Sequence, residues 1–355
     1  MDSTEPFTIR VGTRSSALAL KQTELVISAL QAAHPHARFE VHAQATAGDR
    51  DKTTPLPEMG KGLWTSELEA RLTAGEIDLI VHSLKDMPTT LPEDCVLGCV
   101  PAREDPRDVV VFSAAHGDKY KTIADLPAGS VVGTSSVRRA AQLRRRYPHL
   151  AFRDVRGNID TRVRKCDEDG YDCIILAAAG LLRTGVGARI AQYLESSTPG
   201  GGMLHAVGQG ALGLEVRKSD ERMLGLLKAV EHTPTMMACF AERSVMRTLE
   251  GGCSVPVAVE TEWVEEEEAA TGEEGDEEVR PDRKRKLRLR ATVVSLDGKT
   301  AVDGERTEEV ASLAQADSLG KKLAQELIER GAQSILDVIN QGRTATGAVK
   351  LSEAA

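Results

Sequence analysis

The stretch DLIVHSLKDMPTTLP, at residues 78–92, contains the sharpest element boundary in the chain. Its residues 79–81 are apolar and partly β-branched, as in a buried strand. Pro88 and Pro92 exclude a helical continuation and force an extended exit. Four polar side chains follow directly where the strand ends, namely His82, Ser83, Lys85 and Asp86.

The Lys85–Asp86 pair stands where open α/β sheets bind ligands, outside the carboxyl end of a strand. There the ammonium group can bind an anionic substrate, and the carboxylate can handle a proton or a developing cation. A capped turn with a surface ion pair explains the segment equally well, because such pairs are common and contribute little free energy. The rest of the chain has to distinguish these two interpretations.

Length and composition are typical of a globular protein with two or three compact units, because 355 residues exceed a typical domain of about 100–200 residues. Hydrophobic residues make up 41% and charged residues 28%, which excludes a fibrous or wholly disordered chain. No apolar run approaches the roughly 20 residues of a membrane span, and residues 1–10 lack the features of a secretory signal. We therefore expect a cytoplasmic protein without a membrane partner. The six cysteines have no metal-ligand spacing, so we expect reduced thiols and no metal site.

The charge of the chain is distributed unevenly around a formal net charge of -9. Residues 138–165 contain nine Arg and one Lys against two Asp, a local charge of +8 that leaves -17 for the remainder. This concentration inside an acidic protein indicates a site for anions. Residues 144–146 are also explained as a solvated helix face. Aromatic residues amount to only 3%, too few to stack bases, so we expect no nucleic-acid partner.

Strand and helix patterns alternate along the chain in the way that is typical of parallel α/β sheets. Strands are expected at residues 8–12, 39–45, 79–81, 108–112, 130–133, 172–177, 255–259 and 287–295. Helices are expected at residues 16–32, 313–330 and 332–340, and from about 235 to the Gly pair at 251–252. An acidic block followed by a basic block, within residues 262–290, is interpreted as a solvated insertion in the last domain.

One turn occurs twice, as VGTRSS at residues 11–16 and as VGTSSVR at residues 132–138, and it suggests two similarly built domains. At each copy, backbone N–H groups, Ser hydroxyls and Arg side chains would converge on the start of a helix, which is a ready anion site. Simple N-capping by Ser is the alternative. Two copies, together with Arg14, Arg138 and Arg139, favour binding of a carboxylate or phosphate.

Two further segments suggest function. Residues 46–63 are rich in Gly, Pro and charge without periodicity, so they are a candidate lid, and the next helix is expected to begin with a capping box of Ser66 and Glu69. The Gly pair at 251–252 would present Cys253 on a tight turn. A small buried cysteine that fills a gap is the usual explanation of such a residue.

Five long motifs, in order, closely resemble those of the porphobilinogen deaminases, also called hydroxymethylbilane synthases. They are HSLKDMPT at 82–89, VGTSSVRRAAQL at 132–143, VRGNIDTRVRK at 155–165, AVGQGALGLEVR at 206–217 and LEGGCSVPVAV at 249–259, and VGTRSSALALKQ at 11–22 agrees with them. The match extends over almost all of residues 9–340. Family members often carry a Lys where Ser66 stands, so a second ammonium group beside Lys61 is missing here.

The resemblance implies an α/β fold of three domains, of which the first two are like the lobes of a periplasmic binding protein and the third is a small α+β domain. Domain 1 would comprise residues 1–104 and 205–230, domain 2 residues 105–204, and domain 3 residues 231–355 with the charged insertion at about 262–290. The lack of an obvious apolar interface stripe and the resemblance favour a monomer.

The resemblance also implies a transferase with a dipyrromethane cofactor bound covalently to Cys253. Such an enzyme deaminates four porphobilinogen molecules, joins them head to tail on this primer, and releases the linear tetrapyrrole by hydrolysis for haem synthesis. The runner-up is a non-catalytic carboxylate-binding module of the periplasmic-binding-protein type. It would explain the two anion-binding helix starts but neither Cys253 nor the Lys85–Asp86 pair.

Motif matching implies the role of each site residue. Asp86 matches the catalytic aspartate. The side chains that should contact the cofactor besides Cys253 are Ser83, Lys85, Ser135, Ser136, Arg138, Arg162 and Gln209. Those expected around the incoming substrate are Arg14, Ser16, Gln22, Arg139 and Arg156. The chemistry agrees with this set, because each pyrrole brings two carboxylates and Arg guanidinium groups bind carboxylates through paired hydrogen bonds.

Overall fold

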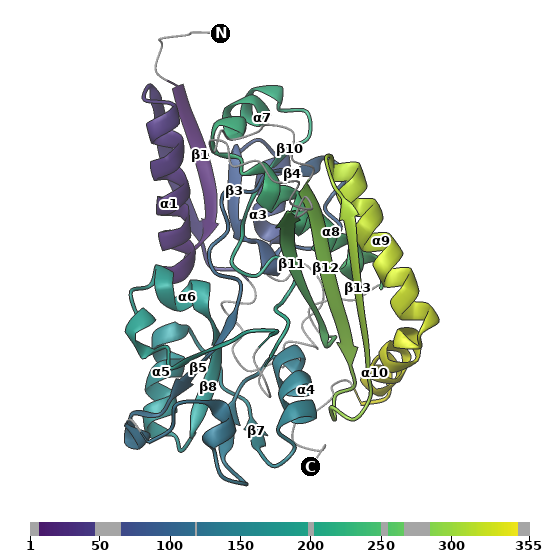
Figure 1. Cartoon of the computed structure of the whole chain (residues 1–355). Coiled ribbons are helices and arrows are strands. Elements are labelled where there is room, and N and C mark those ends of the chain that lie inside the picture. The colour runs from purple at the N-terminus through teal and green to yellow at the C-terminus, as the bar shows by residue number, and fades with distance from the viewer. Residues whose placement is uncertain are drawn as a thin grey trace, which may run out of the picture.

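The residues that the structure describes form three β-sheets with helices packed on them (Figure 1). The computed structural model describes residues 7–46, 65–117, 119–197, 202–249, 255–265 and 285–346, the side chains of 342–346 excepted. None of the helices in these ranges is long and apolar enough to span a membrane. We call each sheet with its helices the first, second and third unit, in chain order.

The first unit is built on a five-stranded sheet of order β2-β1-β3-β10-β4. Its strands are β1 (Phe7–Arg14), β2 (Ala37–Gln44), β3 (Leu79–Ser83), β4 (Cys95–Cys99) and β10 (Leu212–Arg217). Its helices are α1 (Ala17–Ala33), α3 (Ser66–Thr73) and α7 (Glu221–Leu227). Strand β1 runs parallel to β2 and β3, whereas β10 is antiparallel to both β3 and β4. Strand β10 therefore completes this sheet only after the chain has returned from the second unit.

The second unit has a five-stranded sheet of order β7-β6-β8-β5-β9. Its strands are β5 (Asp108–Phe112), β6 (Val131–Gly133), β7 (Ala151–Arg153), β8 (Cys173–Ala177) and β9 (Gln192–Leu194). Its helices are α4 (Val137–Arg146), α5 (Ile159–Glu168) and α6 (Ala178–Arg183). Strand β6 is parallel to β7 and β8, whereas β5 is antiparallel to β8 and β9.

These arrangements confirm the predicted α/β class, but the expectation of parallel sheets is wrong, since both five-stranded sheets are mixed. The reversed strands are β5 and β10, which are the first strands after the chain crosses from one unit into the other. A strand that follows such a crossing enters its sheet at the end opposite to the one where its neighbouring strands begin. The direction of these two strands is thus set by the crossings between units.

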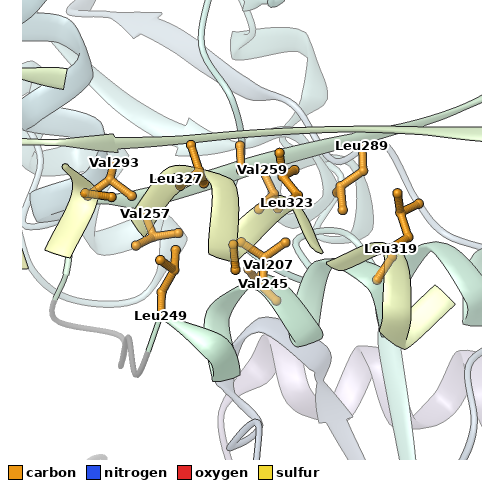
Figure 2. Packing of buried hydrophobic residues seen from close by; sticks show 14 of the residues in the cluster. Val207, Val245, Leu249, Val257, Val259, Leu289, Val293, Leu319, Leu323 and Leu327 are labelled. Atoms are coloured by element: carbon orange, nitrogen blue, oxygen red, sulfur yellow. The ribbon is translucent and has the colours of Figure 1, made fainter. Parts of the chain in front are cut away.

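The third unit has an antiparallel sheet of β11 (Val257–Glu265), β12 (Arg285–Val294) and β13 (Ala301–Glu309). It packs with α8 (Thr233–Thr248), α9 (Leu313–Glu329) and α10 (Ala332–Thr346). Figure 2 shows its core, in which Val245 and Leu249 meet the Leu residues of α9 and the Val residues of β11. Alternate residues of the strands face this core, as expected for a sheet with one solvated face.

Two local expectations are wrong. The insertion is narrower than 262–290, because β11 continues to Glu265 and β12 begins at Arg285, and Arg290 pairs with Glu260 at 3.0 Å across the two strands. The opposite charges thus pair across neighbouring strands. The capping box is absent, because α3 begins with Thr65 as its N-cap and no side chain caps it. Glu69 is then one position too far along and is buried instead. The candidate lid, apart from Thr46, and residues 266–284 lie outside the described residues.

Candidate active site

Lys85 and Asp86 lie in a short 3-10 turn, Leu84–Asp86, directly after β3. Leu84 and Met87 on either side of the pair are buried, so apolar side chains anchor the turn, while Lys85 and Asp86 are half-buried. Arg14 ends the neighbouring parallel strand β1, and its Nη1 lies 3.6 Å from Oδ2 of Asp86. The structure therefore brings together two of the predicted site residues at the carboxyl ends of two adjacent strands.

Lys85 lies among charged groups of both the first and second units. Burial lowers the pKa of Lys85 to about 8, Arg139 and Arg162 act in the same direction, and Asp86 and Asp108 oppose them. Charges of the second unit are thus close enough to act on the turn after β3. An ammonium group that is only weakly held in its charged form gains the most from a ligand that brings a carboxylate.

Asp108 is a buried carboxylate at the start of β5 that joins three predicted site residues. Arg138 donates from Nη1 to its Oδ2 at 2.6 Å, Arg139 donates from Nε to its Oδ1 at 2.9 Å, and Gln209 donates from Nε2 to Oδ1 at 3.0 Å. Burial alone would raise the pKa of Asp108, but Arg138 and Arg139 hold it well below the usual range. The two arginines are therefore fixed before any ligand arrives.

Sequence reasoning missed Asp108. Two features of the sequence could have identified it. Asp108 is the single acidic residue of the apolar strand DVVVF, and the same predicted domain contains the strongly basic segment 138–165. A buried carboxylate in such a strand requires a cationic partner. The Arg pair at 138–139 was the nearest concentration of suitable partners in the predicted second lobe.

Two predicted side chains have a buried polar atom without a hydrogen-bond partner. Arg162, on α5, has a buried Nε without a hydrogen-bond partner, and burial together with Arg139 lowers the pKa of Arg162 to about 10, while Asp86 opposes this. Gln209 has a buried Oε1 without a partner. In a native protein, such atoms call for a specific explanation. A ligand that offers both an acceptor and a donor would satisfy them.

The predicted serines lie at the ends of elements around the same site. Ser16 Oγ caps α1 by accepting from the Ala19 backbone N–H, and Ser136 Oγ caps α4 by accepting from that of Arg139. N-capping, the alternative considered for both turns, is therefore present at each. Ser135 bonds to both backbone groups of Val155 at 3.0 and 3.1 Å, and Ser83 donates to Gln22 Oε1 at 2.9 Å.

The remaining predicted residues are Arg156 and Cys253. Arg156 is half-buried in the loop before α5, whose N-cap is Asn158. Cys253 lies outside the described residues, as does Lys61. The other five cysteines are free and buried. In the described ranges, no group of His, Cys, Asp and Glu side chains is arranged to hold a metal ion.

Two family models cover most of the chain. The model described as "Porphobilinogen deaminase, dipyromethane cofactor binding domain" matches residues 9–225, and "Porphobilinogen deaminase, C-terminal domain" matches residues 236–329. Among solved structures, a probable amino-acid ABC transporter extracellular-binding protein from Bacillus subtilis aligns with 63% of this chain and 90% of its own, at a TM-score of 0.39 and 14% identity.

Curated relatives agree over nearly the full length. The chain is 60% identical to a porphobilinogen deaminase of Neurospora crassa, over 98% of both chains. It is 48% identical to those of Yarrowia lipolytica and of a Synechococcus strain, over 96% and 92% of this chain and 95% of each relative. These matches favour the enzyme over the non-catalytic binding module. The chain belongs to the porphobilinogen deaminase family, the transferases that make hydroxymethylbilane for tetrapyrrole synthesis.

Proposed function

We propose that Asp86 is the catalytic carboxylate of this hydroxymethylbilane synthase, and that Arg14, Lys85 and Arg162 hold the carboxylates of the ligands around it. The observation that carries this proposal is the place of Asp86. It is partly exposed at the end of β3, with Arg14 at 3.6 Å and with Lys85 and Arg162 close enough for their charges to act on each other. Asp86 is thus a carboxylate with cationic side chains around it.

The reaction explains why one carboxylate belongs in a cationic site. Porphobilinogen, the substrate of the family, binds through its two carboxylates, which arginine forks hold in a fixed orientation. Loss of ammonia leaves a positive charge on the substrate ring, and this charge needs a nearby anion in a shielded site. Asp86 is placed to stabilise that charge and to exchange the protons of the reaction.

The dipyrromethane cofactor fits the unsatisfied atoms of the site. When bound, it supplies the terminal pyrrole ring to which the first substrate is joined. Its carboxylates would accept from the buried Nε of Arg162, and its pyrrole N–H groups would donate to the buried Oε1 of Gln209. We propose that Cys253 carries it through a thioether, and that the remaining contacts are those predicted from the sequence: Ser83, Lys85, Ser135, Ser136 and Arg138.

The incoming substrate is proposed to contact Arg14, Ser16, Gln22, Arg139 and Arg156. We propose three domains, formed by residues 1–104 with 205–230, by residues 105–204 and by residues 231–355. We also propose that the protein acts in the cytoplasm as a monomer, without a nucleic-acid or membrane partner. Five buried free thiols suit a reducing compartment. Light scattering of the purified protein should give the molar mass of a single chain, and cell fractionation should find the protein in the cytoplasmic fraction.

The test of the site is Asp86→Asn. The variant should fold and carry the cofactor, shown by an unchanged thermal unfolding curve and intact mass, yet lose about 10²-fold or more in turnover. Turnover at the wild-type rate would make Asp86 structural. In parallel, Cys253→Ser should lack the dipyrrole mass and the colour with acidic aldehyde reagent. An adduct on that variant would refute the attachment site.

A further inference from the structure

Helix α8 supports the turn that carries Asp86, although it belongs to the third unit. Its Val245 and Leu249 face the core of the third sheet (Figure 2). Another face packs against the first unit, where Met236 and Cys239 share a buried cluster with the residues that flank the Lys85–Asp86 pair, Leu84 and Met87. The turn after β3 therefore rests directly on α8.

Arg243 lies one helical turn beyond Cys239 and continues this contact with polar groups. Its side chain is 5% exposed. Nη1 donates to the carbonyl of Met87 at 3.2 Å, and Nη2 donates to the carbonyl of Pro88. These are the first two carbonyl groups after Asp86, and the guanidinium fork spans both. The backbone that leaves the catalytic turn is thus held from α8.

Packing alone does not account for this arginine. Among the described residues, Arg243 forms no salt bridge. Burial lowers the pKa of Arg243 to about 10, and Cys239 and the more distant carboxylate of Glu215 oppose this. A buried charge without a counter-ion is costly, and an apolar side chain of similar volume would often stabilise a core better. The planar fork, however, fixes two adjacent carbonyls with a precision that an apolar side chain cannot supply.

We propose that Arg243 is a positioning residue for Asp86, so that α8 sets the location of the catalytic carboxylate. The inference rests on the catalytic role proposed for Asp86.

Arg243→Met tests the proposal, with Arg247→Met as the matched control. Arg247 lies one turn further along α8, is more exposed, and donates to the carbonyl of Thr89 at 3.4 Å and to Asp317. We expect Arg243→Met to carry the cofactor, to keep KM within about twofold, and to lose about 10- to 100-fold in kcat, since small displacements of reacting groups cost that much. The control should change kcat by less than about threefold. Equal kcat losses in both variants, or none in either, would overturn the proposal.

A double-mutant cycle separates positioning from general damage. If Arg243 acts through Asp86, then Arg243→Met should lower single-turnover rates little further in the Asp86→Asn background. A loss by the same factor in both backgrounds overturns the positioning role, whereas normal turnover of Asp86→Asn alone would refute the catalytic role of Asp86. Should Arg243→Met fail to fold, Arg243→Lys replaces it. A folded Arg243→Lys with the kcat of the wild type would also overturn the proposal.

Discussion

Lys85 is a site residue whose charge changes with pH just above neutrality. Burial lowers the pKa of Lys85 to about 8, so the ammonium group is charged below that pH and neutral above it. A neutral Lys85 cannot attract a carboxylate. The affinity of the site for its anionic ligands should therefore fall as the pH rises through about 8.

We predict that KM for porphobilinogen rises by about tenfold between pH 7.5 and pH 9.5, about the cost of losing one charge-assisted hydrogen bond. Lys85→Arg should remove this rise, because a guanidinium group stays charged. Initial rates over substrate concentration at each pH provide the measurement. An identical KM profile in Lys85→Arg would assign the titration to another group.

Single residues also show where sequence reasoning reaches its limit. Arg14 and Asp86 could be placed together, because parallel neighbouring strands end at the same edge. The link from Arg138 and Arg139 to Asp108 could not, because it joins a strand to a helix 30 residues later along the chain. Spacing along the sequence does not specify which buried charges meet. The sequence predicts these arginines as ligand contacts, and the structure adds that both also pair with a buried aspartate.

Among the elements, the turn between β12 and β13 makes a close contact with α4 of the second unit. Gly298 in this turn has φ of +75°, and a Cβ atom there would lie 2.6 Å from the backbone N of Arg145 and 3.0 Å from the carbonyl of Ala141. Arg144 donates to the carbonyl of Leu296 at 2.9 Å. Part of the basic stretch 144–146 therefore binds the third unit and is more than a solvated face.

Gly298→Ala should separate this turn from α4 and lower the free energy of unfolding by about 2–4 kcal/mol, because backbone strain and a clash with backbone atoms add. Gly129→Ala is the control, since Gly129 has φ of +83° but no atom within 4 Å of a Cβ. It should lose only about 1 kcal/mol. Urea denaturation of both variants measures the difference. Equal losses would mean that the contact with α4 contributes nothing.

Eight of the thirteen strands in the described residues were predicted, but β4, β7, β9, β10 and β13 were not, and neither was the pairing of the strands. Apolar periodicity located β5 at its observed bounds, and it located α1 and α9 within one or two residues. It could not show that β5 and β10 run against their neighbours, because strand direction depends on where the chain enters each sheet. The capping box failed for a local reason, since Thr65 competes with Ser66 for the N-cap.

At the scale of the whole molecule, one buried junction ties the three units together. Arg103, on the crossing from the first to the second unit, donates to both carboxylate oxygens of Glu242 on α8, at 2.6 and 3.1 Å. Glu242 also accepts from the backbone N–H of Gly208 at 2.8 Å and from the hydroxyl of Thr261 at 2.6 Å. Burial alone would raise the pKa of Glu242, but Arg103 lowers it to about 2.

Glu242→Gln should cost about 3–5 kcal/mol, because it leaves Arg103 buried without a counter-charge. We expect calorimetry to give one transition for the wild type and two for Glu242→Gln. In the wild type, the contribution of Glu242 is present above the unfolded pKa of about 4.3 and is lost as the pH falls toward 2, and the variant lacks this dependence. Glu260→Gln, at a half-buried pair with Arg290, serves as control with an expected cost below about 1 kcal/mol. A single transition at the wild-type midpoint in Glu242→Gln would show that the junction does not couple the units.

The place of β10 in the first sheet has a consequence for how the protein is made. On the ribosome, β3 and β4 emerge long before β10, which lies between them and comes after the whole second unit. Until then the nascent first sheet has a missing central strand and two unpaired edges, which invite wrong pairing. The N-terminal unit is thus synthesised first and completed late. A chain stalled before residue 212 should depend on chaperones, while one released after residue 217 should close its own sheet.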